Sequence, residues 1–131
     1  MSRLEGIGLK FPLIAGAVLC FTAVAFGAFG AHALDSLLMS HGRQGVYELA
    51  NRYHFYHGLG LIAIACIRLP IANLDRWVVI PLLVGTLIFS GSLYLLAVTN
   101  ISWFGAITPI GGVLLLIGWA SLVMKVRRTQ S

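Results

Sequence analysis

Four apolar stretches, each about twenty residues long, constrain the fold of this 131-residue chain more than any other feature. They predict membrane spans over residues 11–34, 49–69, 77–98 and 104–124. A helix of about 20 apolar residues crosses a hydrocarbon core that is ~30 Å thick. The sequence is only 10% charged, whereas a soluble domain carries about 25% charged residues. We therefore predict an all-α integral membrane four-helix bundle in which residues 1–131 form a single membrane domain.

The second span needs residues that precede its apolar core. Residues 53–67 alone would reach only about 22 Å as a helix at 1.5 Å per residue. The helix is therefore expected to begin within "VYELANRYHFYHGLG" and to run toward Pro70, because the residue before a proline avoids helical geometry. Glu48 and Arg52 then lie four residues apart in its first turns, near the lipid headgroups.

Basic residues predict the orientation of the spans. With four spans, both termini lie on one side of the membrane, together with the loop between the second and third spans. That side carries seven of the nine Lys and Arg residues, namely Arg3, Lys10, Arg68, Arg76, Lys125, Arg127 and Arg128. The other side carries Arg43 and Arg52. The positive-inside rule therefore predicts that both termini are cytoplasmic, an N-in/C-in topology.

The net charge of +5 indicates membrane lipids as partners, because basic residues at helix ends meet anionic headgroups. These residues do not form one stripe with interleaved aromatic residues, so nucleic-acid binding is not predicted. In the first span, small residues recur at helical spacing: Gly16, Cys20, Ala23, Gly27 and Ala31. Since small residues let membrane helices approach closely, we expect the first span to pack on the second. We also expect a homo-oligomer or a subunit of a larger membrane complex.

Polar residues from all four spans fall in the half of the bilayer opposite the termini. The pocket predicted at this depth comprises His32, Asn51, His54, His57, Ser90, Ser92, Tyr94 and Thr108. Neutral histidine can both donate and accept hydrogen bonds there. Two interpretations stay open. The cluster either holds the helices together, at about 0.6 kcal/mol per hydrogen bond, or binds a small ligand such as a lipid or quinone.

Three further hypotheses concern chemistry at this cluster. His32, His54 and His57 allow a haem- or metal-binding interpretation, since imidazoles ligate haem, zinc and copper, although no carboxylate lies deep enough to support them. A small oligomeric transporter or proton relay is the second alternative, but the inner half lacks matching polar residues. An enzyme is not predicted, because no nucleophile, base and orienting group occur at catalytic spacing. His41, in the glycine-flanked "SHGRQG", is expected to be solvated.

Four motifs resemble those of a known family. They are "GAFGAHAL", "YHFYHGLGL", "FSGSLY" and "TPIGGVLLLIGWA", one in each span, and the resemblance extends over nearly the whole chain. Their order and spacing are similar to the YgdD-like family of small uncharacterised inner-membrane proteins (domain of unknown function four-two-three, with animal relatives named transmembrane protein two-five-six). The resemblance implies a multi-pass protein of the bacterial inner (plasma) membrane with four helices. It leaves the cofactor, the ligand and the molecular function open.

Overall fold

The computed structural model describes the backbone of residues 2–67, 71 and 73–129, and the side chains of residues 10–67, 71 and 73–129. Within these ranges every regular element is helical. The elements are α1 (Ser2–Ala31), α2 (Asp35–His41), α3 (Gln44–Ile67), η1 (Asp75–Val79), α4 (Ile80–Thr99) and α5 (Trp103–Thr129). The π-helical turn η1 continues directly into α4, so the two form one long rod.

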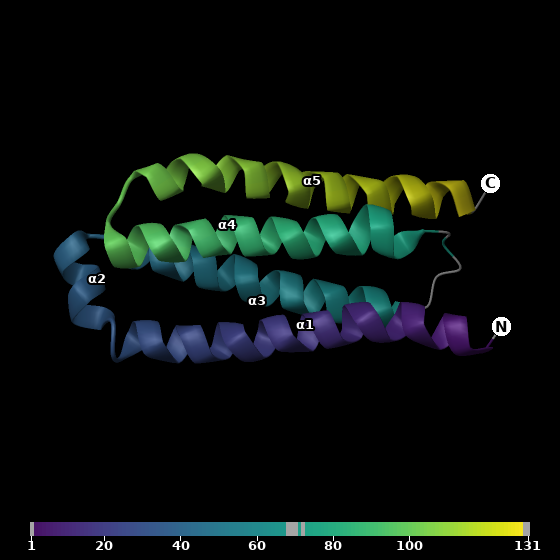
Figure 1. Cartoon of the computed structure of the whole chain (residues 1–131), viewed down its shortest axis with the longest axis horizontal. Coiled ribbons are helices and arrows are strands. Elements are labelled where there is room, and N and C mark those ends of the chain that lie inside the picture. The colour runs from purple at the N-terminus through teal and green to yellow at the C-terminus, as the bar shows by residue number, and fades with distance from the viewer. Residues whose placement is uncertain (1, 68–70, 72, 130–131) are drawn as a thin grey trace.

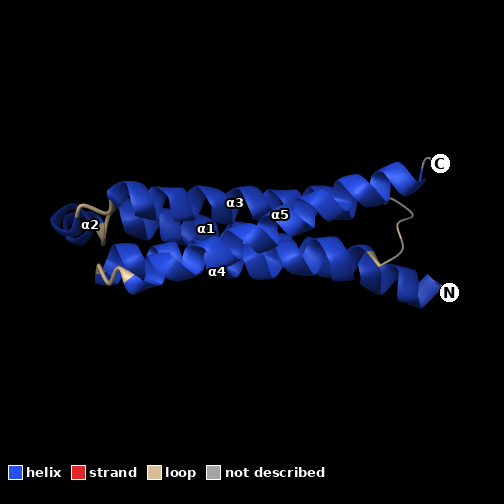
Figure 2. Cartoon of the chain, turned by 90° about the horizontal axis from the view of Figure 1, so that it is seen from above, coloured by secondary structure: helices blue, strands red, loops and turns tan. Residues whose placement is uncertain are grey.

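The long helices α1, α3, α4 and α5 lie side by side along the molecule (Figure 1). The start of α1 and the end of α5 lie at one end, and α2 lies at the other (Figure 2). Helix α1 packs against α3, α3 against α4, and α4 against α5. Among the described residues α1 and α5 have no comparable contact with each other. The helices therefore form an array in which α1 and α5 are the edges.

Three segments are long and apolar enough to cross a membrane: Lys10–Ala31, Asp75–Thr99 and Trp103–Thr129. Helix α3, which covers most of the predicted second span, is not among these candidates in the described part of the chain. It has 24 residues, but Asn51, Arg52 and two histidines lower its mean hydropathy. The predicted end of this span at Pro70 lies outside the described residues.

The chain after α1 differs from the prediction that the first span continues to residue 34. Helix α1 ends at Ala31, a turn follows, and the short helix α2 begins at Asp35. The acidic side chain of Asp35 suits the positive N-terminal end of a helix, and Gly42 ends α2 with a φ of 63°, which glycine adopts without strain. The turn allows Leu38 to be buried against α3 and α4.

His41 also differs from its prediction as a solvated loop residue. It ends α2, and its Nδ1 lies 3.0 Å from the carbonyl oxygen of Ala97 near the end of α4. Arg43 donates from Nε to Oδ1 of Asn100 at 3.0 Å. These two contacts attach the α2 segment to the last turn of α4.

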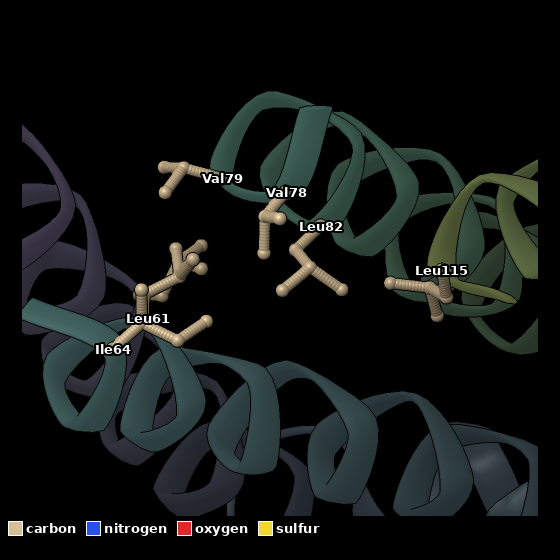
Figure 3. Close-up of a cluster of buried hydrophobic side chains, with 7 residues drawn as sticks. Leu61, Ile64, Val78, Val79, Leu82 and Leu115 are labelled. Atoms are coloured by element: carbon tan, nitrogen blue, oxygen red, sulfur yellow. The ribbon is translucent and has the colours of Figure 1, made fainter. Parts of the chain in front are cut away.

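Two clusters of buried apolar side chains hold the array together. Toward the end that carries the termini, the first cluster comprises Leu19 of α1 together with Leu61, Ile64, Val78, Val79, Leu82 and Leu115 of α3, η1, α4 and α5, and the last six are labelled in Figure 3. Toward α2, the second cluster comprises Leu38, Tyr47, Ala50, Leu93, Tyr94, Leu96 and Ala97. Helices α3 and α4 both supply residues to the two clusters and therefore form the interior of the array.

Glycine sets the closeness of the helix pairs. A Cβ added at Gly16 of α1 would lie 2.6 Å from the carbonyl oxygen of Gly58 in α3. A Cβ at Gly58 would lie 2.8 Å from Sγ of Cys20. Ala23, from the same small-residue series, is 1% exposed. The predicted packing of the first span on the second through small residues is therefore confirmed.

Candidate functional site

Polar side chains of α1, α3 and α4 form one connected group, called here the His54 network. Its members are Thr22, Asn51, His54 and Tyr94. His54 lies with Nε2 2.9 Å from Oγ1 of Thr22 and with Nδ1 3.1 Å from the Tyr94 hydroxyl. Asn51 donates from Nδ2 to the Tyr94 hydroxyl at 3.0 Å and to the carbonyl oxygen of Ala23 at 2.7 Å. The network thus joins three helices through four side chains.

The hydrogen-bond partners determine which ring nitrogen of His54 carries the proton. The Thr22 hydroxyl lies 2.9 Å from the carbonyl oxygen of Val18 and 3.1 Å from that of Leu19. Its single proton is therefore donated to the backbone of α1. Its oxygen therefore accepts from Nε2–H of His54. The Tyr94 hydroxyl accepts from Asn51 and donates to Nδ1 of His54. This arrangement uses every donor of the network with a neutral imidazole.

Aromatic rings surround the network. The ring of Phe26 meets Tyr94 edge to face at 5.1 Å between centroids and meets His54 at 6.0 Å. Tyr47 packs on Tyr94 at 4.9 Å and donates from its hydroxyl to the carbonyl oxygen of Phe26. Hydrogen bonds that are enclosed in this way are stronger than exposed ones. Removing one partner leaves the other as an unpaired buried polar group, which lowers the stability of the fold.

His57 points to another neighbour, α5. Its Nδ1 donates to the carbonyl oxygen of Tyr53 at 2.8 Å, and its Nε2 accepts a hydrogen bond from Nε1 of Trp119 at 3.1 Å. Gly60 leaves room for the indole, since an added Cβ there would lie 3.2 Å from the Trp119 ring. The Trp119–His57 hydrogen bond joins α3 to α5, two helices that otherwise have few contacts in the described part of the chain.

A cavity of about 560 Å³ lies between α3 and α5 and is called here the α3–α5 groove. Its lining residues are Tyr53, His57, Phe89, Pro109, Gly112, Val113, Leu115, Leu116 and Trp119. None of them is charged, and the polar groups come from His57, Trp119 and Tyr53. Small-molecule sites are commonly of about 300–1,000 Å³, mostly apolar and with few polar groups, so the groove has the size and character of a ligand site.

A second cavity, of about 170 Å³, opens near α2 and reaches Asn51. Asp35 of α2 and Glu48 of α3 line it together with glycines of α1. Glu48 is paired with Arg52 at 3.6 Å. The cavity is small and polar at its mouth, and it ends at a residue whose amide nitrogen is already hydrogen-bonded.

The eight residues predicted for one pocket lie in separate contacts. Asn51, His54 and Tyr94 meet in the His54 network. Ser90 donates to the carbonyl oxygen of Ala50 at 2.8 Å, and Ser92 lies 2.7 Å from Oγ1 of Thr108. His57 lines the α3–α5 groove. His32 lies exposed in the turn after α1, apart from the other seven.

The three histidines considered for metal or haem do not converge. Among residues 10–67, 71 and 73–129, no group of three His, Cys, Asp or Glu side chains is placed to hold a metal ion. Both ring nitrogens of His54 and of His57 have protein partners. His32, His54 and His57 therefore do not form the three-imidazole group that their spacing suggested.

Two contact residues were not predicted, Thr22 and Trp119. Thr22 carries an isolated hydroxyl group among the small and apolar residues of the first span. This hydroxyl indicates a hydrogen-bonding residue in the sequence. Trp119 lies in the last apolar stretch, where an indole N–H needs a hydrogen-bond partner. The sequence did not show that the partners would be His54 and His57.

The helices and their buried polar contacts define a small all-helical membrane protein. The chain belongs to the family described as "Protein of unknown function (DUF423)", whose model matches residues 26–112, so the expected family is confirmed. It is 48% identical over 116 residues to a UPF0382 membrane protein of Staphylococcus saprophyticus, covering 88% of this chain and 96% of the relative. It is 40% identical over 121 residues to the UPF0382 membrane protein YwdK of Bacillus subtilis, covering 88% and 95%.

No solved structure matches the chain. The relatives are named membrane proteins of bacteria. Together with the three apolar helices, these names support a bacterial membrane location. They state no molecular function.

Proposed function

We propose that this protein crosses the plasma membrane four times with both termini in the cytoplasm, and that it binds a membrane-dissolved lipid in the α3–α5 groove. The observation that carries the proposal is the groove itself, an uncharged cavity of about 560 Å³ between two helices of a membrane protein. A binding role of this kind needs no catalytic group.

The length and burial of α3 support a fourth span. Its 24 residues extend about 36 Å at 1.5 Å per residue, which exceeds the ~30 Å of the hydrocarbon core. His54 and His57 are only 6% and 8% exposed, so these two polar residues face other helices rather than lipid. Arg52 is exposed, but it lies toward the start of α3 and pairs with Glu48. Basic side chains at the end with the termini then include Lys10, Arg76 and Lys125, as expected for a cytoplasmic face.

Native Cys66 tests this topology, because it is exposed near the end of α3. In a Cys20→Ser background, a membrane-impermeant maleimide added to intact spheroplasts should leave Cys66 unlabelled until the cells are lysed. A Ser40→Cys variant without the native cysteines should be labelled at once, since Ser40 is exposed on α2. The reverse pattern would refute the proposed orientation.

The position of the groove favours a lipid chain as occupant. The lining residues come from the middle of α3, α4 and α5, which supports a groove at the depth of the hydrocarbon in the proposed topology. At its edge, Val113 and Leu116 are 55% and 70% exposed. A chain that fills the groove gains van der Waals contacts along these side chains.

A matched pair of glycine variants tests lipid binding. A Cβ at Gly112 would meet Phe89 at 3.8 Å, an ordinary contact, so Gly112→Leu should fill the groove without displacing the backbone. Gly91 of α4 has nothing within 4 Å and does not line the groove, so Gly91→Leu is the control. Mass spectrometry of co-purified lipid should show that Gly112→Leu loses most of the lipid and Gly91→Leu keeps it. Equal retention by both variants would exclude the groove as the site.

A further inference from the structure

We infer that the ligand of the α3–α5 groove is a neutral lipid whose polar head is a hydroxyl group, and that this hydroxyl inserts between Trp119 and His57. The inference rests on the proposed function and adds the chemical class of the ligand. It follows from the hydrogen-bonding roles of the two side chains at the groove.

The Trp119–His57 hydrogen bond pairs one donor with one acceptor. Nδ1 of His57 donates to the carbonyl oxygen of Tyr53, which leaves Nε2 as an acceptor. Nε1 of Trp119 is a donor only, and it lies 3.1 Å from Nε2. A polar head that entered here and separated the two atoms would have to satisfy both, because an unsatisfied buried polar group is costly.

A single hydroxyl satisfies both atoms. Its O–H donates to Nε2 of His57, and its oxygen accepts from Nε1–H of Trp119. A ketone or ester carbonyl accepts only, so it would leave Nε2 of His57 without a partner. An ammonium group donates only, so it would leave the Trp119 N–H without one.

The absence of charge among the lining residues disfavours ionic heads. No Asp, Glu, Lys or Arg is among the residues that line the groove. A phosphate or carboxylate placed beside His57 would therefore carry an uncompensated charge into an apolar region. The charge character of the groove is thus complementary to a neutral lipid.

The surroundings of Trp119 allow the insertion. The indole is 38% exposed at the surface of the array, and it rests on Gly60 of α3 rather than on a bulky side chain. It can move outward without displacing a core residue, since Trp119 belongs to neither buried cluster. The hydrocarbon part of the ligand then lies along Phe89, Val113 and Leu116.

Fluorescence quenching in nanodiscs tests the inference. In the full chain with Trp77→Phe and Trp103→Phe, Trp119 is the remaining indole, because the sequence has three Trp residues. Lipids with brominated acyl chains quench an indole that they contact. Three probes are compared at equal mole fraction: a brominated diacylglycerol with one hydroxyl, a brominated triacylglycerol with none, and a brominated phosphatidic acid with a charged head.

We expect the diacylglycerol to reach half-quenching at about fivefold lower mole fraction than either other probe, the difference that one net hydrogen bond produces. Unbrominated diacylglycerol should relieve the quenching, and unbrominated triacylglycerol should not. His57→Phe should remove the preference for diacylglycerol. The competition measurement needs no further substitution, so it decides the question even if His57→Phe fails to fold.

The outcomes separate this inference from the proposed function. Equal quenching by all three probes that is lost in Gly112→Leu and kept in Gly91→Leu would overturn the hydroxyl inference and leave lipid binding intact. Equal quenching that is the same in both glycine variants would overturn both. Stronger quenching by phosphatidic acid would also overturn the hydroxyl inference.

Discussion

The two buried histidines of α3 lie three residues apart and carry their protons on different nitrogens. His54 donates through Nε2 to Thr22, whereas His57 donates through Nδ1 to the carbonyl oxygen of Tyr53. In each ring the remaining nitrogen accepts from a fixed donor, Tyr94 or Trp119. Adding a proton to either ring would break a contact between helices. This arrangement favours binding and packing over the proton-relay hypothesis.

Nitrogen NMR of histidine-labelled protein checks the assignment of protons. We expect a neutral Nε2–H form for His54 and a neutral Nδ1–H form for His57 at pH 7. The partner atoms set these forms, so Thr22→Val should change the His54 spectrum and leave that of His57 unchanged. A shared tautomer for the two rings would contradict the hydrogen-bond roles described above.

Removing the Tyr94 hydroxyl should destabilise the protein. Tyr94→Phe leaves Nδ1 of His54 without its donor and one of the two Asn51 N–H groups without its acceptor, while the other still donates to the carbonyl oxygen of Ala23. We expect a loss of about 1 kcal/mol, between the typical membrane hydrogen bond and the cost of an unsatisfied buried group. Thermal unfolding in detergent measures it. Tyr56→Phe is the control, since Tyr56 is 59% exposed, and an equal melting temperature for the two variants would refute the structural role of the network.

At the scale of the helices, glycine determines which pairs can approach. Gly111 of α5 faces the backbone of Phe89 in α4, and Gly85 faces the backbone of Leu115. A close backbone contact at glycine also joins α1 to α3, through Gly16 and Gly58. The contact between α3 and α4 relies instead on side chains, namely the buried apolar clusters and the hydrogen bonds that Ser90 and Tyr94 make to α3. Helix pairs made by close backbone contact therefore alternate with a pair made by side-chain packing.

Gly111→Ala should separate α4 from α5. An added Cβ would clash with the backbone nitrogen of Phe89, and backbone shifts of this kind cost about 1–3 kcal/mol. Gly91→Ala is the matched control, since Gly91 has open space and alanine favours the helix. Thermal unfolding should show a lower melting temperature for Gly111→Ala alone. Equal melting temperatures would show that α4 and α5 tolerate a wider separation.

The sequence predicted the long helices better than it predicted their faces. The length of an apolar stretch defines where a helix can run. The positions of Asn51, His54 and Tyr94 along their helices correctly predicted that these residues lie close together. The rotation of each helix about its axis depends on packing partners, which one sequence does not reveal. His54 and His57 consequently face different neighbours, although their spacing suggested a common stripe. The turn that exposes His32 was missed because α2 is too short to show helical periodicity.

At the scale of the molecule, the array consists of two helical pairs. Helices α1 and α3 form one pair, and α4 and α5 form the other. The pairs meet mainly through α3 and α4, with the Trp119–His57 hydrogen bond as an additional link. Each pair buries its own close contacts, so each is expected to insert as a unit.

Dividing the chain between residues 70 and 71 tests this organisation. Two co-expressed fragments, residues 1–70 and 71–131, should assemble in the membrane, because the division leaves both close helix pairs intact. Affinity purification through a tag on one fragment should recover the other. A division within α4, after Gly85, is the control and should abolish recovery. Failure of the first pair to co-purify would show that the connection between α3 and η1 is required for assembly.

The attachment of α2 to the last turn of α4 has a consequence for recognition from that side. Leu38 is buried, and His41 and Arg43 are tied to the backbone of Ala97 and the side chain of Asn100. The segment between α1 and α3 is therefore a compact cap. A protease or antibody that binds an extended peptide would therefore bind this segment poorly. A protein that docks on a folded surface would find a preformed surface there.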